Sequence, residues 1–109
     1  DNPDESDFFV PSVLRRGSLS IAVSTDGKSP LLAARLRREL ETLITEEYGE
    51  FVEILGEVRE KIKKTDLTIE KRQQVYRQLV DSDILELLKE GEKEKVEERI
   101  ARCISSWQD

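Results

Sequence analysis

Residues 19–40 read LSIAVSTDGKSPLLAARLRREL, and the rest of the chain is organised around this stretch. Its apolar, partly β-branched start predicts a strand over residues 19–23. Ser29 and Pro30 suit the N-cap and the first position of a helix, because a serine hydroxyl accepts a helix N–H and proline lacks one. Leucines at helical spacing follow at positions 32, 36, 40 and 43. The stretch therefore predicts a strand, a short loop and a helix.

The loop over residues 24–29 joins this strand to this helix. Its backbone N–H groups and the positive end of the helix dipole form a natural place for an anion. From local chemistry alone, an ordinary capped turn is the commoner explanation. The sequence contains neither a Walker A motif nor a G-x-G-x-x-G motif.

Composition bounds the class of protein. The chain has 109 residues, 39% charged and 37% hydrophobic, which suits one modest helical domain or one domain with an appendage. It contains no apolar run of the roughly 18 residues that a membrane span needs and no leading signal segment, so we expect no membrane partner. Because it begins at Asp1 rather than Met, we expect a fragment or a processed product.

Cysteine and histidine usage excludes several kinds of site. The chain has one cysteine and no histidine, so an internal disulfide, a Cys/His metal cluster and a Ser–His or Cys–His catalytic pair are excluded. We therefore expect no metal site, and a reducing, cytoplasmic location.

The charge is unevenly distributed. Residues 11–38 carry six basic residues and one acidic residue, whereas the whole chain has a net charge of −6. A basic segment in an acidic protein favours a local anionic partner. No nucleic-acid partner is expected, because no aromatic stacking pattern interleaves the basic residues. An arginine-rich solvated helix face is the alternative.

After Pro30 the sequence is helical almost to its end. We expect a first helix to about Glu47, broken near Tyr48 and Gly49, then helices capped by Thr68 and by Asp81 or Ser82, and a last helix after Gly91. The apolar stripes expected to be buried are Phe51, Leu55, Val58 and Ile62 in the second helix, Val75, Tyr76 and Leu79 in the third, and Val96, Ile100, Ile104 and Trp107 in the last. No strand besides 19–23 is expected within the chain. The predicted fold class is mainly α, with short strand structure at the N-terminal end followed by a helical bundle.

Several motifs occur in a recognisable order over residues 1–64. They are Asp1-Asn2-Pro3, Phe8-Phe9-Val10-Pro11-Ser12, Arg15-Arg16-Gly17, Ser24-Thr25-Asp26-Gly27-Lys28-Ser29-Pro30 and Arg37-Arg38. This order resembles the sirohaem synthase family, and in particular its precorrin-2 dehydrogenase/sirohydrochlorin ferrochelatase module.

The resemblance implies an architecture. Residues 1–12 would be the tail end of a Rossmann-type domain, 13–48 a central region for dimerisation and tetrapyrrole binding, and 49–109 a C-terminal helical domain. The strand structure would be a remnant of the α/β domain. The family's Gly-rich NAD loop lies upstream of the matched region, so NAD would bind outside this chain. A homodimer is implied.

The resemblance also implies chemistry. Members of the family oxidise precorrin-2 to sirohydrochlorin with NAD, and many then insert ferrous iron. The family's catalytic aspartate falls on Asp1, whose carboxylate could take a proton from the macrocycle. A frayed terminal residue is the alternative for Asp1.

The tetrapyrrole substrate is a polycarboxylate, which would explain the basic segment. The family's loop serine falls on Thr25, where the hydroxyl is retained. The implied substrate-binding residues are Ser24, Thr25, Gly27, Lys28, Ser29 and Arg38. Further donors could come from Arg15, Arg16, Arg35 and Arg37. The alternative function is a non-catalytic helical interaction module whose basic helix binds an acidic partner.

Overall fold

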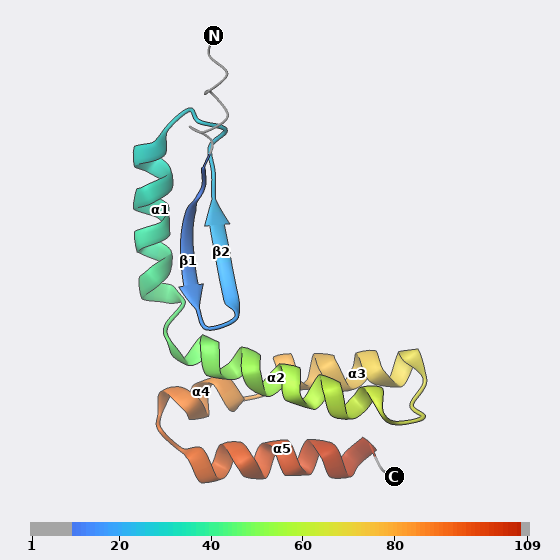
Figure 1. Ribbon diagram of the computed structural model, residues 1–109. Helices are drawn as coiled ribbons and strands as arrows, with labels where there is room; N and C mark the ends of the chain where they lie inside the picture. Colours follow the sequence, from blue (N-terminus) through green and yellow to red (C-terminus); the bar gives the residue numbers. More distant parts are fainter. Residues whose placement is uncertain (1–9, 108–109) are drawn as a thin grey trace. The chain divides into compact units, whose positions relative to one another are not determined.

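A computed structural model describes residues 10–107, which form two compact units that divide between Glu46 and Glu47 (Figure 1). The elements in order are β1 (Ser12–Arg16), β2 (Leu19–Val23), α1 (Pro30–Leu43), α2 (Glu47–Lys63), α3 (Ile69–Val80), α4 (Ile84–Lys89) and α5 (Lys93–Trp107). The expected fold class, strand structure followed by a helical bundle, is confirmed. The expected three-part division at residues 12 and 48 stays a prediction.

The first unit is an antiparallel β1–β2 hairpin with α1 packed along it (Figure 1). The expectation that residues 19–23 would find no strand partner within the chain is wrong, because Leu14 pairs with Ile21 in the hairpin register. Gly17 adopts a left-handed conformation (φ 59°) in the two-residue turn, as short hairpin turns require. Directly opposed residues share a face, so Leu14 and Ile21 both point toward α1.

Helix α1 buries a different side from the one its leucines suggest. Ala33 is its buried residue, at 6% exposure, whereas Leu32, Leu36 and Leu43 are 44%, 38% and 65% exposed. The hairpin contacts the side of the helix that carries Ala33, so Leu32, Leu36 and Leu43 stay exposed within the described residues, whereas Leu40 is half-buried.

The boundary between the first two helices also differs from expectation. Helix α1 ends at Leu43, where Ile44 turns into an extended conformation. Helix α2 begins at Glu47 and runs through Tyr48 and Gly49 instead of breaking there. Gly49 is buried within α2, so packing of the helix outweighs the low helix propensity of glycine at this position.

The second unit is a helical bundle in which α2 packs against α3 and α4, and α5 against α3 and α4. Its centre is fully enclosed, with Ile62 and Ile84 at 0% and Val58 at 2% exposure. The remaining buried core residues are Phe51, Val75, Leu79, Leu85, Leu87 and Val96. The expected cap at Thr68 is confirmed, since its hydroxyl accepts a hydrogen bond from the Lys71 N–H.

Two local expectations in this bundle need correction. The N-cap of α4 is Asp83, which makes no side-chain capping bond; the Ser82 hydroxyl instead accepts from the Ile84 N–H at 3.3 Å. On α5 the core-packed residues at the C-terminal end are Cys103 and Trp107, and Ile104 lies beside this face. The spacing of four, three and four from Val96 follows the helix face more closely than repeated steps of four.

Candidate functional site

The loop between β2 and α1 is closed by its own hydroxyl and backbone groups. The Thr25 carbonyl accepts a hydrogen bond from the Lys28 N–H at 3.1 Å, and the Thr25 hydroxyl accepts from the Ser29 N–H at 2.8 Å. The Ser24 hydroxyl accepts from the Asp26 N–H at 3.3 Å. The expected loop residues are thus brought together, and their hydroxyls already hold the turn.

Two consecutive residues of the loop have left-handed backbone conformations, Asp26 with φ 58° and Gly27 with φ 78°. Aspartate is one of the few side chains that enter this region, and glycine enters it without steric penalty. The turn therefore uses Gly27 for its backbone freedom.

The loop passes directly into the start of α1. The Ser29 hydroxyl accepts from the Leu32 N–H at 3.1 Å, and Pro30 occupies the first turn, so the predicted cap is confirmed. The first turn of α1 contains no acidic residue. Exposed Lys28 and the positive helix end attract an anion here, whereas the exposed carboxylate of Asp26 in the same loop opposes this attraction.

A hollow of about 20 Å³ lies under the loop. It is lined by Val10, Val23, Ser24, Thr25, Gly27, Pro30 and Ala33. A volume of this size holds about one water molecule. An organic ligand would therefore contact the outer side of the loop.

Two of the six basic residues of residues 11–38 are engaged within the unit. Arg16 donates from Nε to the Ile44 carbonyl at 2.8 Å and from Nη2 to the Glu41 carbonyl at 3.2 Å. Arg37 donates from Nε to the Ser12 hydroxyl at 2.8 Å and pairs with the Glu41 carboxylate. Arg16 and Arg37, two of the further donors considered for a ligand, thus connect α1 to β1.

The other four basic side chains, Arg15, Lys28, Arg35 and Arg38, are exposed. Within residues 10–107 their side chains make no hydrogen bond or ion pair. Arg38 lies eight residues after Pro30, about 12 Å along the helix axis. The structure thus places Lys28 in the loop and does not bring Arg38 to it.

The catalytic role expected for Asp1 falls on a residue that lies outside the described residues. Among residues 10–107, no group of three or more Asp, Glu, Cys or His side chains could hold a metal ion. In the same range no helix is long and apolar enough to cross a membrane.

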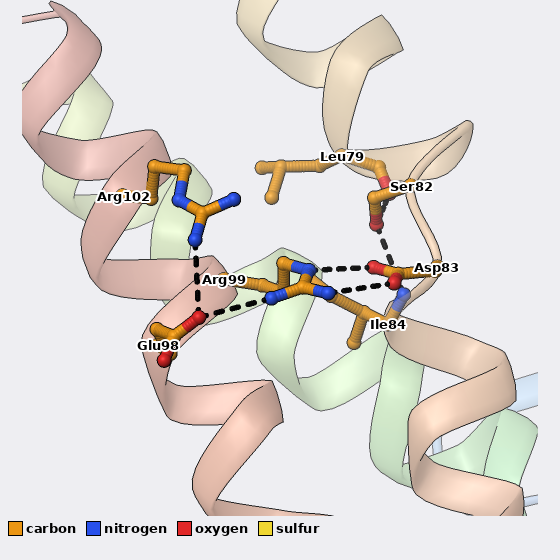
Figure 2. A network of polar contacts seen from close by, with 7 residues as sticks. All are labelled: Leu79, Ser82, Asp83, Ile84, Glu98, Arg99 and Arg102. Atoms are coloured by element: carbon orange, nitrogen blue, oxygen red, sulfur yellow. Dashed lines mark hydrogen bonds and ion pairs between the residues drawn. The ribbon is translucent and has the colours of Figure 1, made fainter.

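A second polar cluster, which the sequence did not indicate, connects α5 to the start of α4. Figure 2 shows the Arg99 guanidinium donating to both Asp83 carboxylate oxygens, at 3.0 Å and 3.1 Å. Glu98 accepts from Arg99 and from Arg102. The bond from Arg99 lowers the pKa of the Asp83 carboxyl and raises the pKa of Arg99. The ion pair between Arg99 and Asp83 joins α5 to the start of α4 and is a structural contact.

Cys103 lies half-buried on α5 beside this cluster. Burial raises the pKa of its thiol. A raised pKa lowers the thiolate fraction, and the thiolate is the nucleophile. Cys103 therefore behaves as a packing residue.

The Thr25 hydroxyl gives a direct test of the loop geometry. We expect Thr25→Val to leave the Ser29 N–H without its acceptor, at a cost of about 1–2 kcal/mol, while Thr25→Ser keeps the bond. Amide hydrogen exchange by NMR should show Ser29 exchanging roughly tenfold faster in the valine variant only. Equal Ser29 exchange in the two variants would contradict this loop structure.

Comparison with known proteins gives consistent matches in both units. The family model described as "Sirohaem biosynthesis protein central" matches residues 16–43, and "Sirohaem synthase dimerisation region" matches residues 47–104. The loop and α1 lie in the first match, and nearly all of the helical bundle lies in the second.

Several curated relatives of the chain are siroheme synthases, in agreement with the two family models. The siroheme synthase of Nitrosomonas europaea is 30% identical over 109 residues, all of this chain and 23% of that protein. That of Psychrobacter cryohalolentis is 35% identical over 91 residues, 84% of this chain and 17% of that protein. Among solved structures, "SirC, precorrin-2 dehydrogenase" matches with TM-score 0.69 and 27% identity, covering 85% of this chain and 46% of that one. The chain thus spans about a quarter or less of the curated relatives' length.

Proposed function

The chain belongs to the sirohaem synthase family, and on this premise we propose that it is the dimerisation and tetrapyrrole-contacting segment of a longer sirohaem-biosynthesis enzyme. The whole enzyme would oxidise precorrin-2 to sirohydrochlorin with NAD and would use ferrous iron as the substrate of a subsequent chelation. It would act in the cytoplasm as a homodimer. The observation that supports the tetrapyrrole role is the loop of residues 24–29, in which exposed Lys28 lies next to the positive end of the α1 dipole.

The loop offers a polycarboxylate two kinds of contact, and its own hydroxyls hold them in place. Exposed Lys28 supplies a point charge, the start of α1 supplies a positive dipole end, and the serine and threonine hydroxyls fix the backbone between them. Arg35 and Arg38 are three residues apart on the outer side of α1 and could bind a carboxylate arm farther along the ligand. A wide ligand with several carboxylate arms suits sites separated in this way.

The segment itself does not fit NAD. Its glycines, at positions 17, 27, 49, 56 and 91, are not spaced as a dinucleotide-binding turn. The 24–29 loop is filled by its own hydrogen bonds and encloses only about 20 Å³. We therefore assign NAD to another part of the longer enzyme and derive no redox step from these residues. The proton-transfer role of Asp1 remains part of the proposal.

A titration of the 109-residue chain with sirohydrochlorin tests the proposal. We expect saturable binding, and we expect Lys28→Glu to weaken it on the order of tenfold, since a charge-assisted contact contributes about 1.5–3 kcal/mol. Arg38→Glu should weaken binding by a similar or smaller factor. The measurements are the absorbance change on titration and the shift in melting temperature.

Lys93→Glu is the control, because it changes the net charge equally but lies at the exposed start of α5. If it weakens binding as much as Lys28→Glu, the ligand responds only to overall charge. If the wild-type chain does not bind sirohydrochlorin at all, the tetrapyrrole role of this segment is refuted. The interaction-module alternative would then gain weight, supported by the exposed Arg35 and Arg38.

A further inference from the structure

One face of α3, continued by the C-cap residue Asp81, carries an exposed polar stripe made of Lys71, Gln74, Gln78 and Asp81. Their spacings of three, four and three keep them on one side of the helix, next to the core-facing Val75. Neither the Lys71 ammonium nor the Asp81 carboxylate has a hydrogen-bond or ion-pair partner within the part of the chain that is described. The two ends of the stripe thus carry opposite, unpaired charges.

The stripe is bordered by hollows in the surface of the helical bundle. One of about 380 Å³ lies between α3 and α5 and is lined by Leu67, Lys71, Gln74, Val75, Gln78, Ser106 and Trp107. A second, of about 250 Å³, continues from Gln78 toward Ile84 and Cys103 and is mostly apolar. Helices pack by placing the side-chain ridge of one into the groove beside the ridge of the other. This surface offers both a ridge and a groove.

The stripe is complementary to itself. If two copies of α3 lie antiparallel about a two-fold axis level with residue 76, Lys71 of each copy is opposite Asp81 of the other. The same axis sets Gln74 of each copy opposite Gln78 of the other. A glutamine amide can donate and accept, so the pair satisfies itself. One symmetry axis therefore matches both pairs, as an isologous contact requires.

We propose that the α3 stripe is a contact surface between two copies of this chain, with Lys71 and Gln74 of one copy paired with Asp81 and Gln78 of the other. The inference rests on the proposed function, in which this segment contributes to a homodimer. It adds the surface, the helix orientation and the residue pairs. The paired ridges also cover the mouth of the α3–α5 hollow.

Charge reversal tests the pairing. Lys71→Asp sets two aspartates against each other at both ends of the symmetric contact, and Asp81→Lys does the same with lysines. Each single variant should raise the dimer dissociation constant by at least about tenfold at low salt, where exposed charges are least screened. Sedimentation velocity over a concentration series measures this. Both changes suit the helix dipole of α3, so loss of the helix does not explain the effect.

Two rescues make the test specific. The double variant Lys71→Asp/Asp81→Lys restores opposite charges and should dimerise like the wild type. An equimolar mixture of the two single variants should form heterodimers, because each contact then joins an aspartate to a lysine. Lys95→Asp is the matched control, since Lys95 is an exposed lysine at the third position of α5, as Lys71 is in α3.

The outcomes separate this inference from the proposed function. A wild-type dimer whose dissociation constant is unchanged by both single variants, or changed equally by Lys95→Asp, refutes the α3 contact and leaves a dimer through another surface. Loss of dimerisation without rescue in the mixture also refutes the pairing. A wild-type monomer at concentrations near 100 µM would refute both this contact and the dimerisation role.

Discussion

Ile62→Ala is expected to unfold most of the helical bundle at moderate denaturant, because Ile62 is 0% exposed at the centre of its core. Truncating a fully enclosed isoleucine leaves a cavity and costs about 2–5 kcal/mol. Small domains have a free energy of unfolding of about 5–15 kcal/mol, so this is a large share of the total. Urea unfolding followed by far-UV circular dichroism should show the midpoint falling steeply with an unchanged slope.

Ile69→Ala is the matched control, because it is the same substitution in the same unit at a site that is 72% exposed. We expect a change within about 0.5 kcal/mol, since the exposed Ile69 side chain takes part in neither the core nor the Thr68–Lys71 cap bond. Similar losses at the two sites would contradict the packing of α2 in this bundle.

The helical bundle was the most predictable part of the chain, because its helices carry their own signals. The four- and three-residue steps from Phe51 to Ile62 predicted the buried face of α2, and three of its four members are buried. The Thr68 cap and the Gly91 break were equally local. The error on α5 came from continuing the apolar stripe in a step of four from Ile100 to Ile104, whereas a step of three to Cys103 follows the buried face.

Strand β1 could not be predicted, and its composition explains why. Of its residues that face α1, only Leu14 is apolar, and Ser12 and Arg16 are held there by hydrogen bonds to α1. These bonds join residues 25 to 28 positions apart, so no local window contains both partners. When these long-range hydrogen bonds are not known, residues 12–16 show only a short basic pattern and lack the alternation of apolar and polar residues that indicates a strand.

The candidate site also has some features that short-range sequence rules predict and others that depend on tertiary contacts. The cap at Ser29 and the left-handed Gly27 follow from short-range sequence rules, and the structure confirms both. The use of Thr25 to accept from Ser29 is also local, although the sequence could not separate it from a ligand-binding hydroxyl. The division of the basic residues into structural and exposed ones needed the tertiary contacts.

That division has a consequence for how substitutions in this segment should be interpreted. Arg16 and Arg37 hold α1 against the hairpin, and the 24–29 loop joins these two elements. Removing either arginine would loosen the frame of the loop, so weaker tetrapyrrole binding in such a variant would not identify a ligand contact. Exposed Lys28 and Arg38 are free of this ambiguity.

Arg16→Ala is expected to destabilise the first unit by about 1–3 kcal/mol. The last turn of α1 contains no basic residue, and Arg16 on β1 donates instead to the Glu41 carbonyl in that turn and to the carbonyl of the C-cap residue Ile44. Alanine leaves these part-buried carbonyls without that donor and removes the cation from the negative end of the helix. Native-state hydrogen exchange should show the amides of α1 opening more readily, while those of α2–α5 keep their protection.

Arg15→Ala is the neighbouring control, because Arg15 projects from the other face of the hairpin and is exposed. It should leave exchange in α1 within about 0.5 kcal/mol of the wild type. Arg16→Lys should recover only part of the loss, since an ammonium lacks the planar fork that reaches two carbonyls at once. If Arg15→Ala and Arg16→Ala open α1 equally, the effect is one of charge alone. The assignment of Arg16 as the C-terminal cap of α1 would then fail, and Arg16 would return to the set of ligand-binding candidates.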